Sequence, residues 1–367
     1  MKKLNEQNIK EILKNIKDID SKNNIVETGT VNNIIINKEL VSIVLNIKHE
    51  EKLYSNIIKE CEENLKIYDN SINYNIVLTA ENNNKVNPNT TNKEGNNNIK
   101  PKGIKYIIAI ASGKGGVGKS TLTTNLALSL SKKNIKIGIL DADIYGPSQP
   151  TMLGVRDKKP EQTGNGKITT INNYGIKCMS IGFLIEEEKP MIWRGPMVQG
   201  ALEQLIKDVD WGELDILFVD MPPGTGDVQL TMSQRVPLTG AIIVSTPQDI
   251  ALIDARKGLN MFKKVEVPII GIIENMSYYK CPNCNEKTML FGNGGAKTTA
   301  NEMNVPFLGE VPLDIEIRIN SDKGQPNKLF SENSKQSLYF NKISNKILNF
   351  IEETNQNISN EPIIKFE

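Results

Sequence analysis

The chain has 367 residues, which is enough for roughly two domains of about 150 residues each. Hydrophobic residues make up 38% of the sequence, charged residues 24%, and the formal net charge is +1. This balance provides no general attraction to nucleic acid or to an anionic membrane, so we expect neither as a partner. Because no run of about 18 apolar residues occurs and the N-terminus lacks a signal peptide's apolar centre, we expect a cytoplasmic protein.

The first 80 residues predict a small α+β domain. Two segments have helical periodicity and three are β-branched runs typical of strands. The predicted helices are 6–16 and 54–65, and the predicted strands are 30–37, 40–47 and 72–79. The following segment 81–103, ENNNKVNPNTTNKEGNNNIKPKG, has almost no apolar residue. It cannot bury enough surface to fold, so we interpret it as a disordered linker.

Residues 104–353 predict an α/β domain, and residues 354–367 a C-terminal tail. Short β-branched runs alternate here with stretches long enough for helices, which is typical of a mostly parallel, doubly wound sheet covered on both faces. The predicted strands are 104–111, 136–140, 176–181, 214–219, 241–245 and 268–273. Ligands of such a fold bind at the carboxyl ends of the strands.

The first of these strands runs directly into GKGGVGKST, which matches the phosphate-binding P-loop pattern. The glycines allow backbone N–H groups to turn toward phosphate oxygens. We expect Lys119 to reach the β and γ phosphates and the Ser120 hydroxyl to bind Mg²⁺. The segment therefore predicts ATP and Mg²⁺ as cofactors. The expected nucleotide-binding residues are Gly113, Lys114, Gly115, Gly116, Val117, Gly118, Lys119, Ser120 and Thr121.

Carboxylates follow two further strands. Asp141 and Asp143 come directly after the strand 136–140, and their spacing points both toward a metal ion and an attacking water. Asp220 ends the strand 214–219 and resembles a Walker B aspartate, which holds Mg²⁺ through water. The segment MPPGTGD after it contains two glycines, which suit a loop that approaches the γ-phosphate. Three strand ends are thus predicted to meet at one metal and phosphate site.

The loop also contains Lys114, and the form KGGxGK[ST] resembles the deviant P-loop of the MinD/ParA/Mrp class. The resemblance implies that Lys114 reaches the nucleotide of a partner subunit, which in turn implies a homodimer. It further implies that Asp143 positions or activates the attacking water, that Asp141 supports the metal site, and that Asn275 reads the base. Lys114, Lys119 and Asp143 are accordingly the expected catalytic residues.

A more specific resemblance rests on four strings: DxDxYGPS, MIWRGPM (Met191 to Met197), DMPPGTGD and ENMSYYxCPxC. Together they resemble the Mrp/ApbC family of iron-sulfur cluster carrier ATPases, over about residues 105–318. The resemblance implies a homodimer that holds a [4Fe-4S] cluster and passes it to apo iron-sulfur proteins, working with cluster assembly factors.

The Cys-x-x-Cys pair, Cys281 and Cys284, is the candidate metal site. A stable tetrahedral or cubane site normally takes four thiolates, which two chains would provide together. A bridging structural zinc ion has the same ligand spacing and stays an alternative, as does a redox dithiol. We expect Cys178 to lie in a core strand and Cys61 to face a helix-packing surface. His49 is the only histidine.

The N-terminal unit weakly resembles the small domain that often precedes Mrp-type ATPases. It has DIDSKNN and IKHEEKLYS where that domain commonly has an acidic motif and a reactive cysteine, so we expect a docking or dimerisation role. The alternative function for the whole chain is a MinD/ParA-like ATPase switch with a structural zinc at the Cys-x-x-Cys. Its membrane-bound form needs a basic amphipathic C-terminal helix, whereas the helix expected at 334–352 suits core packing.

Overall fold

The computed structural model describes residues 6–19, 23–37, 40–47, 54–68, 73–80, 101–164, 166–184, 195–331 and 334–359. The chain divides into two compact units, Met1–Lys93 and Glu94–Glu367. Each unit is described by itself.

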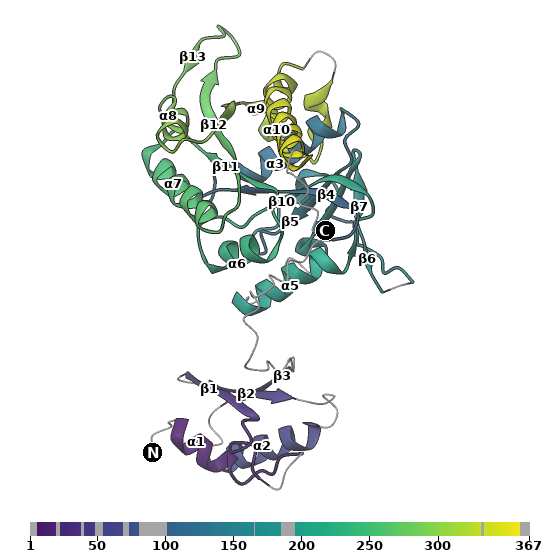
Figure 1. Ribbon diagram of the computed structural model, residues 1–367, viewed down its shortest axis with the longest axis vertical. Coiled ribbons are helices and arrows are strands. Elements are labelled where there is room, and N and C mark those ends of the chain that lie inside the picture. Colours follow the sequence, from purple (N-terminus) through teal and green to yellow (C-terminus); the bar gives the residue numbers. More distant parts are fainter. Residues whose placement is uncertain are drawn as a thin grey trace, which may run out of the picture. The chain divides into compact units, whose positions relative to one another are not determined.

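The small unit is a three-stranded sheet with two helices on one face (Figure 1). Strand β2 pairs with β1 antiparallel and with β3 parallel. Ile9 and Leu13 of the first helix and Leu65 of the second are fully buried in the core of this unit. All five predicted elements are present, with ends that differ by a few residues. The elements are α1 (Glu6–Leu13), β1 (Val31–Asn37), β2 (Leu40–Ile47), α2 (Ser55–Tyr68) and β3 (Asn73–Ala80).

The large unit is built on a nine-stranded sheet in the order β13-β12-β11-β4-β10-β5-β8-β7, with β14 also paired to β12. Seven of its strands are joined by parallel pairings, and short antiparallel strands are added at two places. The parallel strands are β4 (Ile104–Ala111), β5 (Ile137–Asp141), β8 (Ile176–Ser180), β10 (Leu214–Asp220), β11 (Gly240–Ser245), β12 (Ile269–Lys280) and β14 (Phe307–Leu313). The antiparallel ones are β7 (Ile171–Asn173) and β13 (Lys287–Thr288).

Helices cover both faces of this sheet, which explains why its central strands are apolar on both sides. Strands β5 and β11 are buried along their whole length. Helices α3 and α10 pack together on one face, and α5, α6 and α7 lie on the other (Figure 1). The helices are α3 (Lys119–Ser131), α4 (Gln149–Met152), α5 (Gly195–Lys207), α6 (Asp227–Arg235), α7 (Asp249–Lys264), α8 (Gly295–Glu302), α9 (Ile315–Asp322) and α10 (Gln336–Ser359). The predicted doubly wound α/β fold is confirmed.

Several boundaries differ from those predicted. Strand β12 continues to Lys280 instead of ending at 273, so Asn275 lies within a strand. Strand β14 was not predicted, because Gly309 and Pro312 interrupt its apolar pattern. A small parallel pair, β6 (Ile168–Thr169) with β9 (Val209–Asp210), was also missed. Helix α10 extends to Ser359, into the predicted tail.

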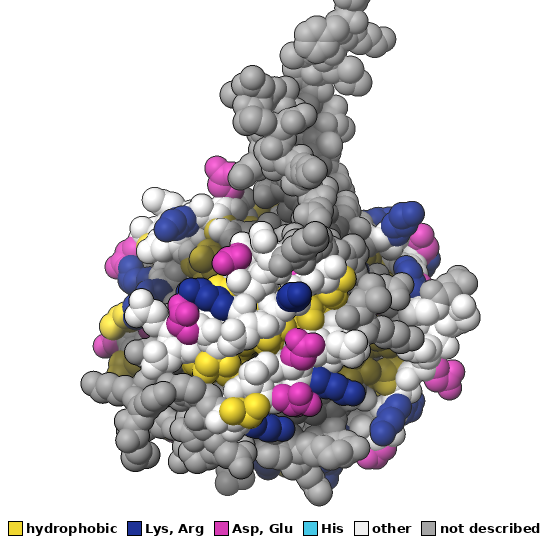
Figure 2. All heavy atoms as spheres, turned by 90° about the horizontal axis from the view of Figure 1, so that it is seen from below, with side chains coloured by type: hydrophobic (Ala, Val, Ile, Leu, Met, Phe, Trp, Pro, Cys, Tyr) yellow, Lys and Arg dark blue, Asp and Glu magenta, His cyan; other side chains and the backbone are white. Residues whose placement is uncertain are grey.

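Some predictions fall outside the described residues. These are residues 81–100 of the linker, 191–194 of the MIWRGPM segment, His49, and 360–367 of the tail. Within the described part of the chain, no helix combines the length and apolar character needed to cross a membrane. On the face shown in Figure 2, basic and acidic side chains are interspersed. Among the coloured residues of that face no single sign of charge dominates, which agrees with the net charge of +1.

The first P-loop glycine is in close contact with helix α7. A Cβ atom at Gly113 would lie 2.2 Å from the backbone carbonyl carbon and oxygen of Asp254. Because backbone atoms cannot move aside cheaply, we expect Gly113→Ala to reduce the free energy of unfolding by about 1–3 kcal/mol, as overpacking does. Urea unfolding of the nucleotide-free protein measures this. Gly226→Ala is the control, since a Cβ there meets no atom within 4 Å; equal losses in the two variants would contradict the prediction.

Candidate functional site

The candidate site lies where three neighbouring strands end. Strand β10 stands between β4 and β5, and its last residue, Asp220, is in register with Asp141 of β5 and Ile110 of β4. Since the strands are parallel, their carboxyl ends lie at one edge. This pairing brings the P-loop, which follows β4, next to both carboxylates, as expected.

The P-loop wraps tightly at two glycines. Gly116 and Gly118 have φ values of 80° and 82°, a left-handed conformation that favours glycine. Helix α3 begins immediately afterwards, at Lys119, so its free N–H groups and positive dipole end face the loop. The geometry suits an anion such as a nucleotide phosphate.

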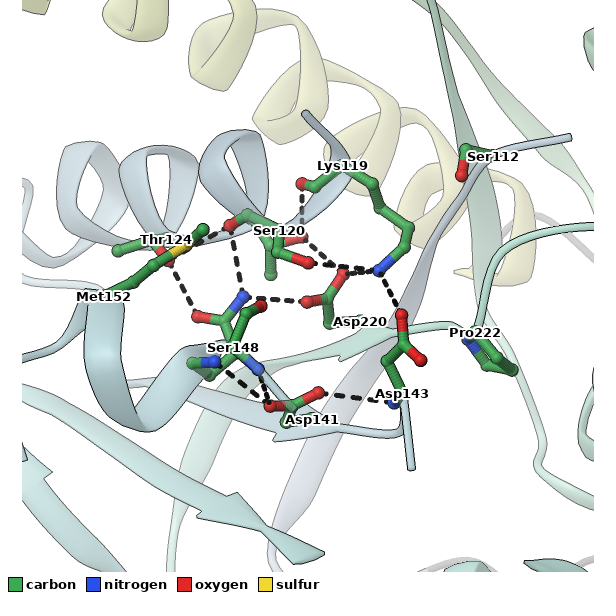
Figure 3. Close-up of polar contacts among 12 residues, drawn as sticks. Ser112, Lys119, Ser120, Thr124, Asp141, Asp143, Ser148, Met152, Asp220 and Pro222 are labelled. Carbon is green, nitrogen blue, oxygen red and sulfur yellow. Dashed lines mark hydrogen bonds and ion pairs between the residues drawn. The ribbon is translucent and has the colours of Figure 1, made fainter. Parts of the chain in front are cut away.

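Lys119 is the centre of the polar contacts drawn in Figure 3. Its side chain is only 6% exposed, and its Nζ lies 2.5 Å from Oδ1 of Asp220 and 3.9 Å from Oδ2 of Asp143. The same Nζ donates to the Ser120 hydroxyl at 3.2 Å. A buried ammonium group needs such partners, because desolvation is costly. An incoming phosphate would therefore compete with Asp220 for Lys119.

The oxygen atoms gathered around Lys119 fit a magnesium ion. The Ser120 hydroxyl and the carboxylates of Asp143 and Asp220 are hard oxygen ligands of the kind that Mg²⁺ prefers. Burial raises the pKa of Asp143, while the positive charge of Lys119 opposes that rise. The roles assigned to these residues from the sequence stay predictions, but the fold brings all of them together.

Asp141 lies deeper than Asp143, and its carboxylate is hydrogen-bonded to neighbouring protein groups. It is fully buried and accepts hydrogen bonds from the backbone N–H groups of Ser148 and Gln149, at 3.0 and 3.1 Å, and from the Ser180 hydroxyl. Burial, followed by the negative charge of Asp220, raises the pKa of Asp141 to about 7. Asp141 thus organises the segment that carries Asp143.

The sequence analysis missed Gln149, a fully buried residue beside Asp141. Its Nε2 donates to Oδ2 of Asp220 at 2.8 Å and to the Ser120 carbonyl at 3.1 Å. Its Oε1 accepts from the Thr124 hydroxyl at 2.7 Å. One amide therefore orients Asp220 and ties it to helix α3. The available signal was its position directly after the string DADIYGPS.

Lys114 is exposed to solvent, whereas Asn275 is buried against the P-loop. The Lys114 side chain is exposed and has no ion pair within the described residues, so it is free to contact another chain. Asn275 is buried, and its Nδ2 donates to the Val117 carbonyl at 2.8 Å. A Cβ at Gly118 would lie 2.2 Å from that nitrogen. Asn275 therefore braces the P-loop here, and its predicted contact with a base stays a prediction.

The Cys-x-x-Cys pair lies in the turn between β12 and β13. The Cys281 N–H donates to the Glu286 carbonyl, and the Asn285 N–H to the Cys281 carbonyl, both at 2.9 Å. Cys281 is half-buried and Cys284 is exposed. Backbone N–H groups of Cys284 and Asn283 lower the pKa of Cys281, which favours the thiolate that metals bind.

The described residues of one chain contain no cluster of three or more His, Cys, Asp or Glu side chains able to hold a metal ion. The two other cysteines, Cys61 of the small unit and Cys178 of the large one, are buried, as predicted. Burial raises the pKa of Cys61 to about 12 and that of Cys178 well above its usual value. Both are therefore core thiols.

Comparison with known proteins identifies the family. The model for "ParA: NUBPL iron-transfer P-loop NTPase" matches residues 103–348, which is about two thirds of the chain. The chain belongs to this family. As a NUBPL-type P-loop NTPase, it is an ATP hydrolase, and the resemblance noted in the sequence is confirmed.

Individual relatives agree with this assignment. The "Iron-sulfur cluster transfer protein NUBPL" of Dictyostelium discoideum is 55% identical over 254 residues, covering 69% of this chain and 79% of the relative. The "Iron-sulfur cluster carrier protein" of Haemophilus influenzae is 50% identical over 257 residues, covering 70% of each. A solved nucleotide-binding protein from Archaeoglobus fulgidus, in complex with ADP, is 39% identical with a TM-score of 0.56, covering 65% of this chain and 92% of that one.

The contacts of Gln149 predict its effect on stability. Gln149→Leu leaves the buried Asp220 without one donor, so we expect a loss of about 1–3 kcal/mol in the free energy of unfolding. We also expect slower ATP hydrolysis, because Asp220 is the predicted Mg²⁺ ligand. Urea unfolding and phosphate release measure the two effects. Gln204→Leu on the exposed side of α5 is the control; a Gln149→Leu variant as stable and active as this control would contradict the prediction.

The environments of the four thiols predict their reactivity. In the reduced native protein we expect iodoacetamide to alkylate Cys281 and Cys284 but not Cys61 or Cys178, because the thiolate is the nucleophile. The rate at Cys281 should rise with pH and reach half its maximum below the pH typical of a free thiol, since its pKa is lowered. Peptide mass spectrometry at several pH values measures this. Equal labelling of all four thiols without denaturant would show the prediction to be wrong.

Proposed function

We propose that this protein is an ATP-dependent iron-sulfur cluster carrier. Two copies together bind one [4Fe-4S] cluster through Cys281 and Cys284 and pass it to apo-proteins. The observation that carries the proposal is an accessible pair of thiols, one with a lowered pKa, at the end of a strand that also contacts the P-loop. The printed names of the relatives, which are cluster transfer and carrier proteins, support it.

The number of thiols supports a dimer. A [4Fe-4S] cluster takes four cysteine thiolates, and each chain contributes two exposed or half-buried ones. A two-fold axis beside the pair would bring four together. The exposed side chain of Lys114 suits the same dimer, because it is free to reach the partner's nucleotide.

ATP would bind at the ends of β4, β5 and β10. In our proposal the P-loop N–H groups and Lys119 hold the phosphates, and Asp143 orients the attacking water. Bound Mg²⁺, held by Ser120 and through water by Asp220, would neutralise charge that develops on the phosphates. The Lys119–Asp220 pair must open when ATP enters, so nucleotide binding changes the site's internal contacts.

Strand β12 offers a route from ATP to the cluster. Asn275 donates to the P-loop, and a Cβ at Gly118 would lie 3.6 Å from the Met276 side chain. Met276 has φ 55°, which is uncommon for a residue that is not glycine, and the pairing of β12 with β14 is irregular between Asn275 and Tyr279. Cys281 lies two residues after Tyr279, where this irregular stretch ends. We propose that hydrolysis shifts this stretch and loosens the cluster for transfer.

The remaining functional expectations belong to the same proposal. The partners are apo iron-sulfur proteins and cluster assembly factors, without nucleic acid or membrane, and the location is the cytoplasm. The N-terminal unit has its one described cysteine, Cys61, buried in its core, which agrees with a docking or dimerisation role rather than a metal-binding one.

Metal analysis tests the proposal. After anaerobic reconstitution we expect about four irons and four sulfides per two chains, as a shared [4Fe-4S] cluster requires. Cys281→Ala with Cys284→Ala should bind none, because no other accessible thiols replace them. Cys61→Ala is the control and should keep the cluster.

The alternative is decided by the same measurement. About half a zinc ion per chain, with no iron or sulfide, would support a MinD/ParA-like switch with a structural zinc. A cluster that persists in the double Cys→Ala variant would contradict the carrier site.

A further inference from the structure

A basic groove lies between β14, α8 and the N-terminal half of α10. It encloses about 660 Å³ and is lined by Lys297 of α8, Glu310 of β14, and Leu338, Tyr339, Lys342 and Lys346 of α10. We call it the lysine groove. In Figure 1, α8, β12 and α10 stand next to one another at this end of the sheet.

The positive charge of the lysine groove is not neutralised. Within the described residues, none of Lys297, Lys342 and Lys346 forms an ion pair, and Lys346 instead donates to the Phe307 carbonyl at 2.8 Å. Burial and the neighbouring charge of Lys342 lower the pKa of Lys346. Three lysines thus face one carboxylate, Glu310. Such a concentration of one sign attracts an anionic partner.

The walls of the groove are partly apolar. The Leu338 side chain is 65% exposed, and the partly exposed Tyr339 also lines the groove, with Ile343 buried beneath. A nucleic-acid backbone or a small anion would leave these apolar surfaces unused. An acidic peptide segment with one or two apolar side chains would use both features, since peptide sites combine charge with apolar pockets.

The groove is adjacent to the Cys-x-x-Cys turn. Tyr339 also lines a second cavity, of about 310 Å³, which includes Cys281 and Ile315 in its walls. The carboxylate of Asp314 in that cavity already accepts from the Glu316 N–H and from Gln336. Glu316, Lys280 and Lys335 also line this cavity, so its charges are of both signs. A segment lying in the lysine groove would continue past Tyr339 toward Cys281 with a part that need not be acidic.

We infer that the lysine groove docks an acidic, partly apolar segment of the proteins that receive the cluster. The inference rests on the proposed carrier function. Transfer is then a ligand exchange: recipient thiols lose their protons and bind iron, while Cys281 and Cys284 release iron and take up protons. No electron moves, so no oxidant or reductant is required. Docking supplies the recipient at high local concentration beside Cys281.

Binding of a defined acidic recipient tests the inference. The probe is a fluorescently labelled acidic apo-ferredoxin of the [4Fe-4S] type, titrated with the full-length, cluster-free protein. The test variant is Lys297→Glu with Lys342→Glu, and the control is Lys158→Glu with Lys159→Glu, two exposed lysines in the loop after α4. Reversing two docking charges should weaken binding at least about tenfold.

We expect the wild-type and control proteins to bind the probe alike, with affinity that falls as salt increases. Equal affinity of the groove variant and the control, or no binding by the wild type, would overturn the inference. So would groove-dependent binding of a single-stranded oligonucleotide in place of the ferredoxin. Iron and sulfide content after reconstitution is measured on the same variants and should be unchanged. Failure of the proposed carrier function would appear separately, because the wild type itself would then contain no iron.

Discussion

The buried pair of Lys119 and Asp220 is the interaction on which the site depends. It joins the first residue of α3 to the last residue of β10, over a distance of 2.5 Å in a region closed to solvent. Because neither charge could stay buried alone, the pair holds helix and strand together until a phosphate takes its place. Gln149 then keeps Asp220 oriented from the other side. The site is therefore organised in advance for an anion and a metal ion.

The Cys-x-x-Cys pair is connected to this site by one continuous strand. Strand β12 carries Asn275, which braces the P-loop, and ends one residue before Cys281. The irregular stretch around Met276 divides the strand into two parts. An ATP-dependent carrier requires coupling between its nucleotide site and its cluster site. A strand that contacts the P-loop and leads to Cys281 is a short path for that coupling. The lysine groove lies beside the same strand, so recipient, cargo and nucleotide would all act on β12.

Local patterns in the sequence predicted most of the fold and the main parts of the site. The buried β-branched runs predicted the parallel strands. Strands that are covered on both faces are apolar along their whole length, and such continuous runs are easily recognised in a sequence. Strand β14 was missed because Gly309 and Pro312 interrupt its apolar pattern. Its pairing with β12 stabilises the strand in spite of these two residues. Gln149 was missed for a different reason: a single glutamine has no local signature, and its role arises from Asp220, which lies far along the chain.

By itself, the sequence determined a P-loop pattern at Gly113 to Ser120 and a Cys-x-x-Cys pair at Cys281 and Cys284, because both depend on the spacing of neighbouring residues. Only the tertiary structure decided that Lys119 pairs with Asp220, that Asn275 contacts Val117, and that three lysines share a groove with Leu338. These contacts join segments distant in the chain. They follow from strand order and helix packing, which no local spacing records.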